Sequence, residues 1–96
     1  MRRREYFEKL LVNGVFISKI IIDPHYEDKH SESINDEIIL NLVRTLNGQK
    51  FDVVKEKFPY KYFVTDKIIL DGKRYKLIWL LEEYQTYLSV INAYRR

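Results

Sequence analysis

An Asp-Gly dipeptide at positions 71–72 is the feature that most restricts how this chain can fold. It separates two runs, residues 60–70 and 73–81, that are rich in aromatic and β-branched side chains. Asp-Gly between two such runs is a strong signal for a two-residue β-hairpin, because both positions of a type I′ turn need a positive φ. A third run of the same kind, residues 86–95, follows Glu83-Tyr84-Gln85. Together the three runs predict an antiparallel meander.

The two turns also predict which residues face one another across the strands. With regular strands, the expected pairs are Leu70 with Lys73, Thr65 with Ile78, Leu81 with Tyr87, and Lys76 with Asn92. This register places Lys67, Lys76 and Asn92 together at one end of one sheet face. Both faces of the meander carry apolar side chains. The central strand is therefore either covered on both sides or leaves one aromatic-lined groove open.

The first part of the chain predicts a helix and a strand. Four apolar side chains recur at helical spacing in residues 2–13 and predict a short helix that ends at Gly14. These side chains are Tyr6, Phe7, Leu10 and Leu11. Residues 15–23 are rich in β-branched side chains and precede a proline, which predicts a strand that joins the meander as a fourth member.

A second helix is expected after residue 33. Ser33 can cap it, with Asp36 three positions later in a variant of the capping box. An apolar stripe then continues to the end of this helix, before Asn47-Gly48; its members are Ile34, Ile38, Ile39, Leu42, Val43 and Leu46. Residues 49–59 are mixed and charged, and predict a loop that holds at most a short strand. The sequence therefore predicts one α+β domain, residues 1–96, with two helices packed on an antiparallel sheet of about four strands.

Both histidines of the chain, His25 and His30, lie in the polar segment 24–33 between the expected strand and the second helix. An imidazole has an ordinary pKa of about 6.5, so two of them in one loop can act as base and acid near neutral pH. Two exposed loop histidines without a chemical role are the alternative interpretation. Glu27 and Asp28 lie beside them, but the spacing is not that of a helical metal motif, and we expect no metal and no cofactor.

Charge and composition limit the partners. The formal net charge is +3; basic side chains outnumber acidic ones near both ends, while acidic ones dominate residues 25–48. The basic ends make binding to a polyanion plausible. No cysteine is present, so no disulfide or thiolate metal site can hold the fold. No apolar run is long enough for a transmembrane helix, and the arginine-rich start has no signal-peptide stretch. We therefore expect a cytoplasmic protein that does not interact with membranes.

The order of elements resembles a known family. The expected helix, strand, histidine loop, helix and meander, with Lys29-His30 before the capped helix and the closing run 88–96, resemble small ribonuclease toxins related to RelE, BrnT and the barnase, EndoU and colicin-type nucleases. Members often place His-x-x-Lys-His ahead of a helix. Here one more residue separates His25 from Lys29-His30, so the spacing leaves open whether His25 or only His30 matches a family histidine.

The resemblance implies a metal-independent endoribonuclease toxin, with RNA as substrate and a cognate antitoxin protein as partner. Its reaction needs a base, an acid and cations that stabilise a pentacovalent phosphate. The expected catalytic residues are His25, His30 and Lys29, and those expected to bind RNA or phosphate are Arg74, Lys76, Asn92, Tyr94 and Arg95. The alternative is a non-catalytic RNA- or protein-binding module in which Tyr75, Trp79 and Tyr87 are stacking or interface anchors.

Overall fold

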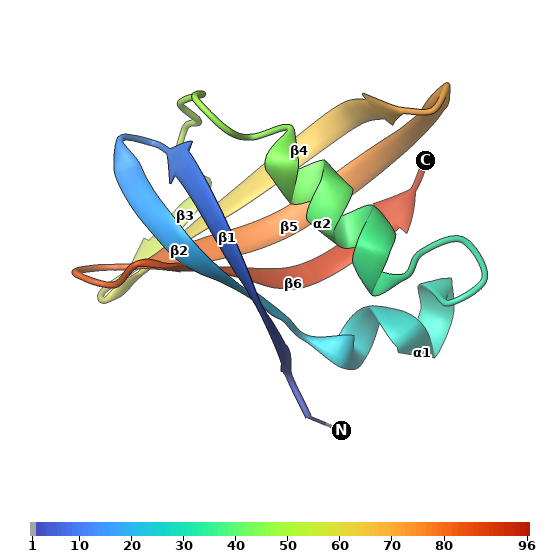
Figure 1. Ribbon diagram of the computed structural model, residues 1–96, viewed down its shortest axis with the longest axis horizontal. Coiled ribbons are helices and arrows are strands. Elements are labelled where there is room, and N and C mark those ends of the chain that lie inside the picture. Colours follow the sequence, from blue (N-terminus) through green and yellow to red (C-terminus); the bar gives the residue numbers. More distant parts are fainter. Residues whose placement is uncertain (1) are drawn as a thin grey trace.

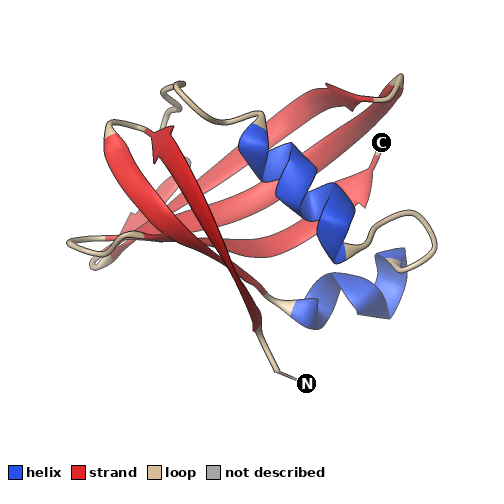
Figure 2. Cartoon of the chain, viewed as in Figure 1, coloured by secondary structure: helices blue, strands red, loops and turns tan. Residues whose placement is uncertain are grey.

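A computed structural model describes residues 2–96 as a six-stranded mixed sheet with three short helical segments (Figures 1 and 2). The elements are β1 (Arg4–Val12), β2 (Val15–Ile22), the 3-10 helix η1 (Pro24–Tyr26), α1 (Glu27–His30), α2 (Asp36–Arg44), β3 (Lys55–Lys57), β4 (Tyr60–Leu70), β5 (Lys73–Glu82) and β6 (Tyr87–Arg95). The strand order is β1-β2-β6-β5-β4-β3. The α+β class is confirmed, but the sheet has more strands than the expected four, and β2 pairs with β6 in parallel.

The helix expected over residues 2–13 is wrong, because this segment is strand β1. Its side chains alternate between the two sides of the sheet: Leu10 and Val12 are buried, while Phe7 is 87% exposed. Asn13 (φ 54°) and Gly14 (φ 74°) form the turn to β2, since both adopt the positive φ that a two-residue hairpin needs. The strand therefore follows from the same turn rule that predicts the β4–β5 hairpin.

The meander β4–β5–β6 is confirmed, and so is the pairing of Leu70 with Lys73. The register further from that turn is wrong. A bulge that includes Lys67 (φ 59°) makes Thr65 face Leu77 in place of Ile78.

The second hairpin departs from the expected register as well. Its turn holds Tyr84 at a φ of 65°, and Leu81 faces Leu88 in place of Tyr87. A further irregularity after Ile78 places Lys76 opposite Tyr94, while Asn92 faces Ile78. The expected pair of Lys76 with Asn92 does not form, and the cluster that depended on it is wrong.

Helix α2 covers one face of the curved sheet (Figure 1). It begins two residues later than expected, because Asn35 caps it in place of Ser33, accepting a hydrogen bond from the Ile38 backbone N–H (2.8 Å). The stripe packs as expected for a core; its buried members are Ile34, Ile39, Leu42, Val43 and Leu46. Tyr75 and Trp79 lie in the same core, at 4% and 0% exposure, so neither is the surface anchor that the alternative function required.

The other face of the meander, here called the open face, lies on the side of the sheet opposite to α2. Strand alternation assigns to it the neighbours of the buried residues of β4, β5 and β6. These include Tyr60, Tyr62 and Val64 on β4, Arg74, Lys76, Ile78 and Leu80 on β5, and Ser89, Asn92 and Tyr94 on β6. Most of them are half-buried or exposed. Within residues 2–96, no helix has both the length and the apolar character needed to cross a membrane.

Candidate functional site

The segment that carries the histidines is an ordered pair of helical turns rather than the expected loop. Asp23 caps η1 by accepting a hydrogen bond from the backbone N–H of His25 (2.9 Å), and Pro24 fixes the first turn. Tyr26 is only 2% exposed and packs into the core. Both η1 and α1 lie against β6. The buried tyrosine therefore holds the histidine segment at the end of the sheet.

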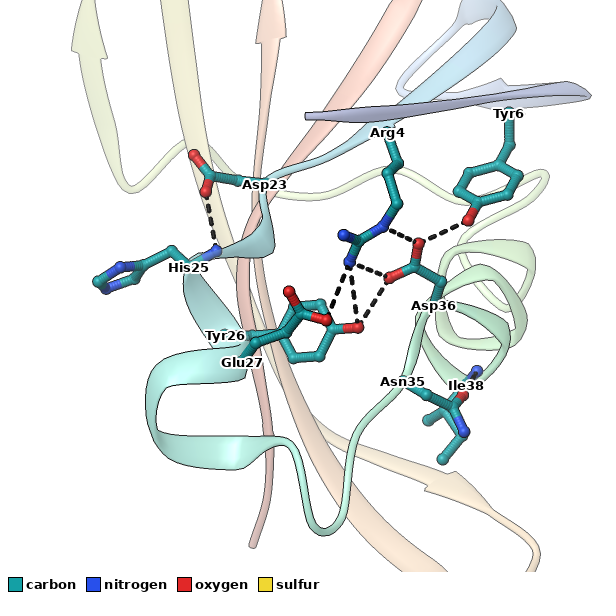
Figure 3. A network of polar contacts seen from close by, with 9 residues as sticks. All are labelled: Arg4, Tyr6, Asp23, His25, Tyr26, Glu27, Asn35, Asp36 and Ile38. Carbon is teal, nitrogen blue, oxygen red and sulfur yellow. Dashed lines mark hydrogen bonds and ion pairs between the residues drawn. The ribbon is translucent and has the colours of Figure 1, made fainter. Parts of the chain in front are cut away.

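A polar network at the start of α2 holds this segment from the other side (Figure 3). Asp36 accepts hydrogen bonds from the hydroxyls of Tyr6 (2.5 Å) and Tyr26 (2.7 Å), and from the guanidinium of Arg4. Arg4 also forms an ion pair with Glu27 (3.5 Å). The network joins β1, η1, α1 and α2 through side chains that are far apart in the sequence.

The charges in this network stabilise one another. Burial raises the pKa of Asp36, but the hydrogen bonds from Arg4, Tyr6 and Tyr26 outweigh burial and lower it to about 2. The hydrogen bond to Asp36 raises the pKa of the Arg4 guanidinium. Burial and the bond to the same carboxylate raise the pKa of the Tyr26 hydroxyl. Arg4 and Asp36 thus stay charged near neutral pH and the tyrosine stays neutral, which suits a structural connection.

The residues that the structure brings together for chemistry are His30, Tyr94 and Lys76. The imidazole of His30 stacks on the Tyr94 ring, with centroids 5.1 Å apart and planes inclined by 25°. Lys76 Nζ lies 5.6 Å from the centroid of the same ring, within the range of a cation–π contact. All three side chains are half-buried. An imidazole and an ammonium group therefore both contact one phenol ring at the end of the open face.

The other expected site residues divide into two groups. Arg74 and Asn92 lie on the same face as Lys76, although the Asn92 carboxamide oxygen already accepts a bond from the Ala93 N–H (2.9 Å). Arg95 pairs with the buried Tyr75, so it extends from the side of the sheet that carries α2.

The two remaining catalytic candidates, His25 and Lys29, are both exposed. His25 is exposed, with its Nδ1 3.5 Å from an Asp28 oxygen, and it points away from the Arg4–Asp36 network (Figure 3). Lys29 is exposed on α1. The two imidazoles therefore have different neighbours: Asp28 for His25, and Tyr94 for His30.

Sequence reasoning missed the four network residues, Arg4, Tyr6, Tyr26 and Asp36. Asp36 was recognised only as part of a helix cap. Tyr26 gave one usable signal, since a tyrosine inside a charged segment is a candidate for a buried anchor with a polar tip. Arg4 and Tyr6 gave no such signal, because the spacing of the apolar residues in their segment predicts a helix and not a strand.

Among residues 2–96, no group of three or more histidine, aspartate or glutamate side chains has an arrangement that could hold a metal ion. Comparisons with models of protein families, with curated proteins and with solved structures find no match to this chain.

Proposed function

We propose that this protein is a metal-independent endoribonuclease, acting in the cytoplasm as the toxin of a toxin–antitoxin pair. One observation carries the proposal: His30 is stacked on Tyr94 while Lys76 lies over the same ring. Stacking occupies the face of the imidazole, whereas its nitrogens, which exchange protons, lie at the ring edge. Lys76 and, two residues away on the same face, Arg74 supply positive charge for a phosphate.

The proposed reaction is transphosphorylation of RNA. A base removes the proton of a ribose 2′-hydroxyl, and the 2′-oxygen forms a bond to the adjacent phosphorus. The bond from phosphorus to the 5′-oxygen breaks, and an acid gives a proton to that oxygen. The products are a 2′,3′-cyclic phosphate and a 5′-hydroxyl, so no oxidant, water or metal is consumed. Lys76 and Arg74 would stabilise the extra negative charge of the pentacovalent phosphate.

His30 is the base in this proposal, and two groups are candidates for the acid. Tyr94 is in contact with His30 and has a hydroxyl on the same face as Lys76. His25 is the other candidate, although its ring lies beside Asp28. Tyr94→Phe and His25→Ala separate them: the variant that lacks the acid should lose activity, while the other should keep it.

The test uses purified protein with single-stranded RNA, in the presence of EDTA. We expect cleavage of RNA and no cleavage of DNA of the same sequence, because DNA has no 2′-hydroxyl. His30→Ala should reduce cleavage by about 10²- to 10⁴-fold, the usual contribution of a general acid or base. Cleavage that EDTA abolishes, or a His30→Ala variant that is as active as the parent, would overturn the proposal.

Expression in cells tests the toxin part separately. Cells producing the parent chain should stop growing, and cells producing His30→Ala at the same level should not. The half-buried tyrosines of the open face favour one other candidate, a non-catalytic RNA-binding module. Binding to RNA without any cleavage, and growth equal for parent and variant, would identify that alternative.

A further inference from the structure

A hollow in the open face lies beside the proposed site. It has a volume of about 430 Å³, within the range of small-molecule binding pockets. Its lining comes from five parts of the chain and includes three tyrosines, Tyr60, Tyr62 and Tyr87. Leu80, Ser89, Ile21, Asp23 and Arg3 complete the part of the lining that bears on binding. Three tyrosines in one hollow are notable because a tyrosine ring offers a flat face on which another ring can stack.

Strand register explains why the surface is hollow there. Tyr62 faces Leu80 across β4 and β5, Leu80 faces Ser89 on β6, and Ser89 faces Ile21 on β2. The short side chain of Ser89 therefore lies between larger neighbours and forms a low floor. Tyr60 and Tyr62 form one wall, with ring centroids 6.4 Å apart and planes inclined by 56°. At this angle the two rings do not stack on each other, so a flat ligand can lie on one of them.

Charged and polar groups surround the hollow. The Arg3 side chain is 69% exposed and pairs with Asp23 at 3.5 Å. Such a surface ion pair contributes little stability, so Arg3 can turn to a phosphate at small cost. The Asp23 carboxylate and the Ser89 hydroxyl can accept hydrogen bonds from the amino groups on a base edge. Glu82 holds the hydroxyl of Tyr87, which fixes that ring in place.

The hollow is also at a suitable distance from the proposed site. Leu80 on its floor is four residues from Lys76 on the same strand, which corresponds to about 13 Å. Ile78 lies between them on the same face of β5. A single RNA strand that passes Lys76 would therefore continue across the sheet towards the tyrosines.

We infer that this tyrosine-lined hollow binds one unpaired base of a single-stranded RNA, next to the phosphate held at Lys76. The inference deepens the proposed function, because it names single-stranded RNA as the substrate form and assigns a base-binding subsite. Stacking of a base on an aromatic side chain tolerates any sequence. The acceptors at Asp23 and Ser89 add a preference for a base that carries an amino group.

The test measures binding apart from cleavage. The probe is a fluorescent single-stranded RNA of about ten nucleotides in which every 2′-hydroxyl is methylated, so that it cannot be cleaved. Tyr62→Ala should weaken its binding about tenfold, as expected for the loss of one stacked base. Tyr62→Phe keeps the ring and should bind like the parent. Ser89→Leu fills the hollow without removing a tyrosine, and should weaken binding to a similar extent.

A matched control is Tyr84→Ala, since Tyr84 is 90% exposed on the β5–β6 turn and does not line the hollow. It should leave binding unchanged. The inference is overturned if the parent does not bind the probe, or if Tyr62→Ala and Ser89→Leu bind it as the parent does. These outcomes are distinct from failure of the proposed function: a protein that binds the probe through Tyr62 but never cleaves RNA keeps the subsite and loses the catalysis.

Discussion

At the scale of single residues, Asp36 links the local chemistry to the placement of the site. Its carboxylate lies at the first position of α2 and holds Arg4 on β1 and Tyr26 on η1. Tyr26 in turn precedes the turn that presents His30 to Tyr94. His30 was a candidate for its chemistry, Lys76 for the expected register and Tyr94 for the family resemblance of the last strand. The contact among them was not predicted, because it depends on β6 register and on this network.

The network predicts how stability depends on pH. The pKa of Asp36 falls from an ordinary value of 3.8 to about 2 in the folded protein, so its ionised form stabilises the fold above the unfolded pKa. This contribution, about 2 kcal/mol, should be present at neutral pH and disappear as the pH falls from about 5 to 2. Asp36→Asn has no such titration. In urea unfolding at several pH values, the difference in the free energy of unfolding between the parent and Asp36→Asn should therefore decrease by about 2 kcal/mol on acidification.

The matched control for Asp36 is Asp52→Asn, which changes an exposed carboxylate in the loop before β3. It should follow the parent at every pH. If the difference in the free energy of unfolding between the parent and Asp36→Asn stays constant down to pH 2, the role assigned to the Asp36 carboxylate is wrong.

Among the helices and strands, the turns explain which expected elements and which expected strand pairings form. Asp71-Gly72 predicted its hairpin, and Asn13-Gly14 carried the same signal for β1–β2. The spacing of Tyr6 and Leu10 also fits a helix, and that competing pattern produced the wrong element. The bulge at Lys67 and the turn at Tyr84 gave no signal, because lysine and tyrosine rarely adopt a positive φ. The bulge shifted the β4–β5 register by one residue. The Tyr84 turn and the irregularity after Ile78 each shifted the β5–β6 register by one residue, and together they moved Asn92 away from Lys76.

The β5–β6 turn offers a direct test of this backbone strain. A left-handed conformation costs a non-glycine residue about 1–2 kcal/mol. Glycine relieves this strain, but its larger conformational entropy in the unfolded state offsets part of the stabilisation. Tyr84→Gly should therefore raise the free energy of unfolding by about 0.5–1 kcal/mol. Tyr84→Ala keeps the strained backbone and removes only an exposed ring, so it should change stability little. Equal stabilisation by both variants in urea unfolding would show that the side chain, not the backbone, is responsible.

At the scale of the whole molecule, the fold separates a covered face from an open one. Helix α2 and the core occupy one side of the sheet (Figure 1). Strand register places Tyr60, Tyr62 and Tyr94 on the other side, together with Arg74 and Lys76. The C-terminus lies beside Arg74 at the start of β5, since the Arg96 N–H donates a hydrogen bond to the Arg74 carbonyl (2.7 Å). The net charge of +3 is small, so the RNA binding proposed above would depend on the arrangement of cations on the open face.

That arrangement predicts a specific salt dependence for binding of the methylated RNA. Each phosphate contact with a single strand contributes about −0.7 to the slope of log K against log salt concentration, because counterions are released. Contacts by Lys76, Arg74 and Arg3 give a slope of about −2.1, or about an 18-fold loss of affinity for a fourfold rise in salt.

Lys76→Ala should therefore change the slope to about −1.4. Lys73→Ala removes the same charge from the neighbouring turn, but its side chain lies on the face opposite to Lys76, so it should leave the slope unchanged. Fluorescence anisotropy at several salt concentrations measures all three slopes. Equal slopes for both variants would mean that RNA senses only the total charge of this end of the molecule, and the path across the open face would then be wrong.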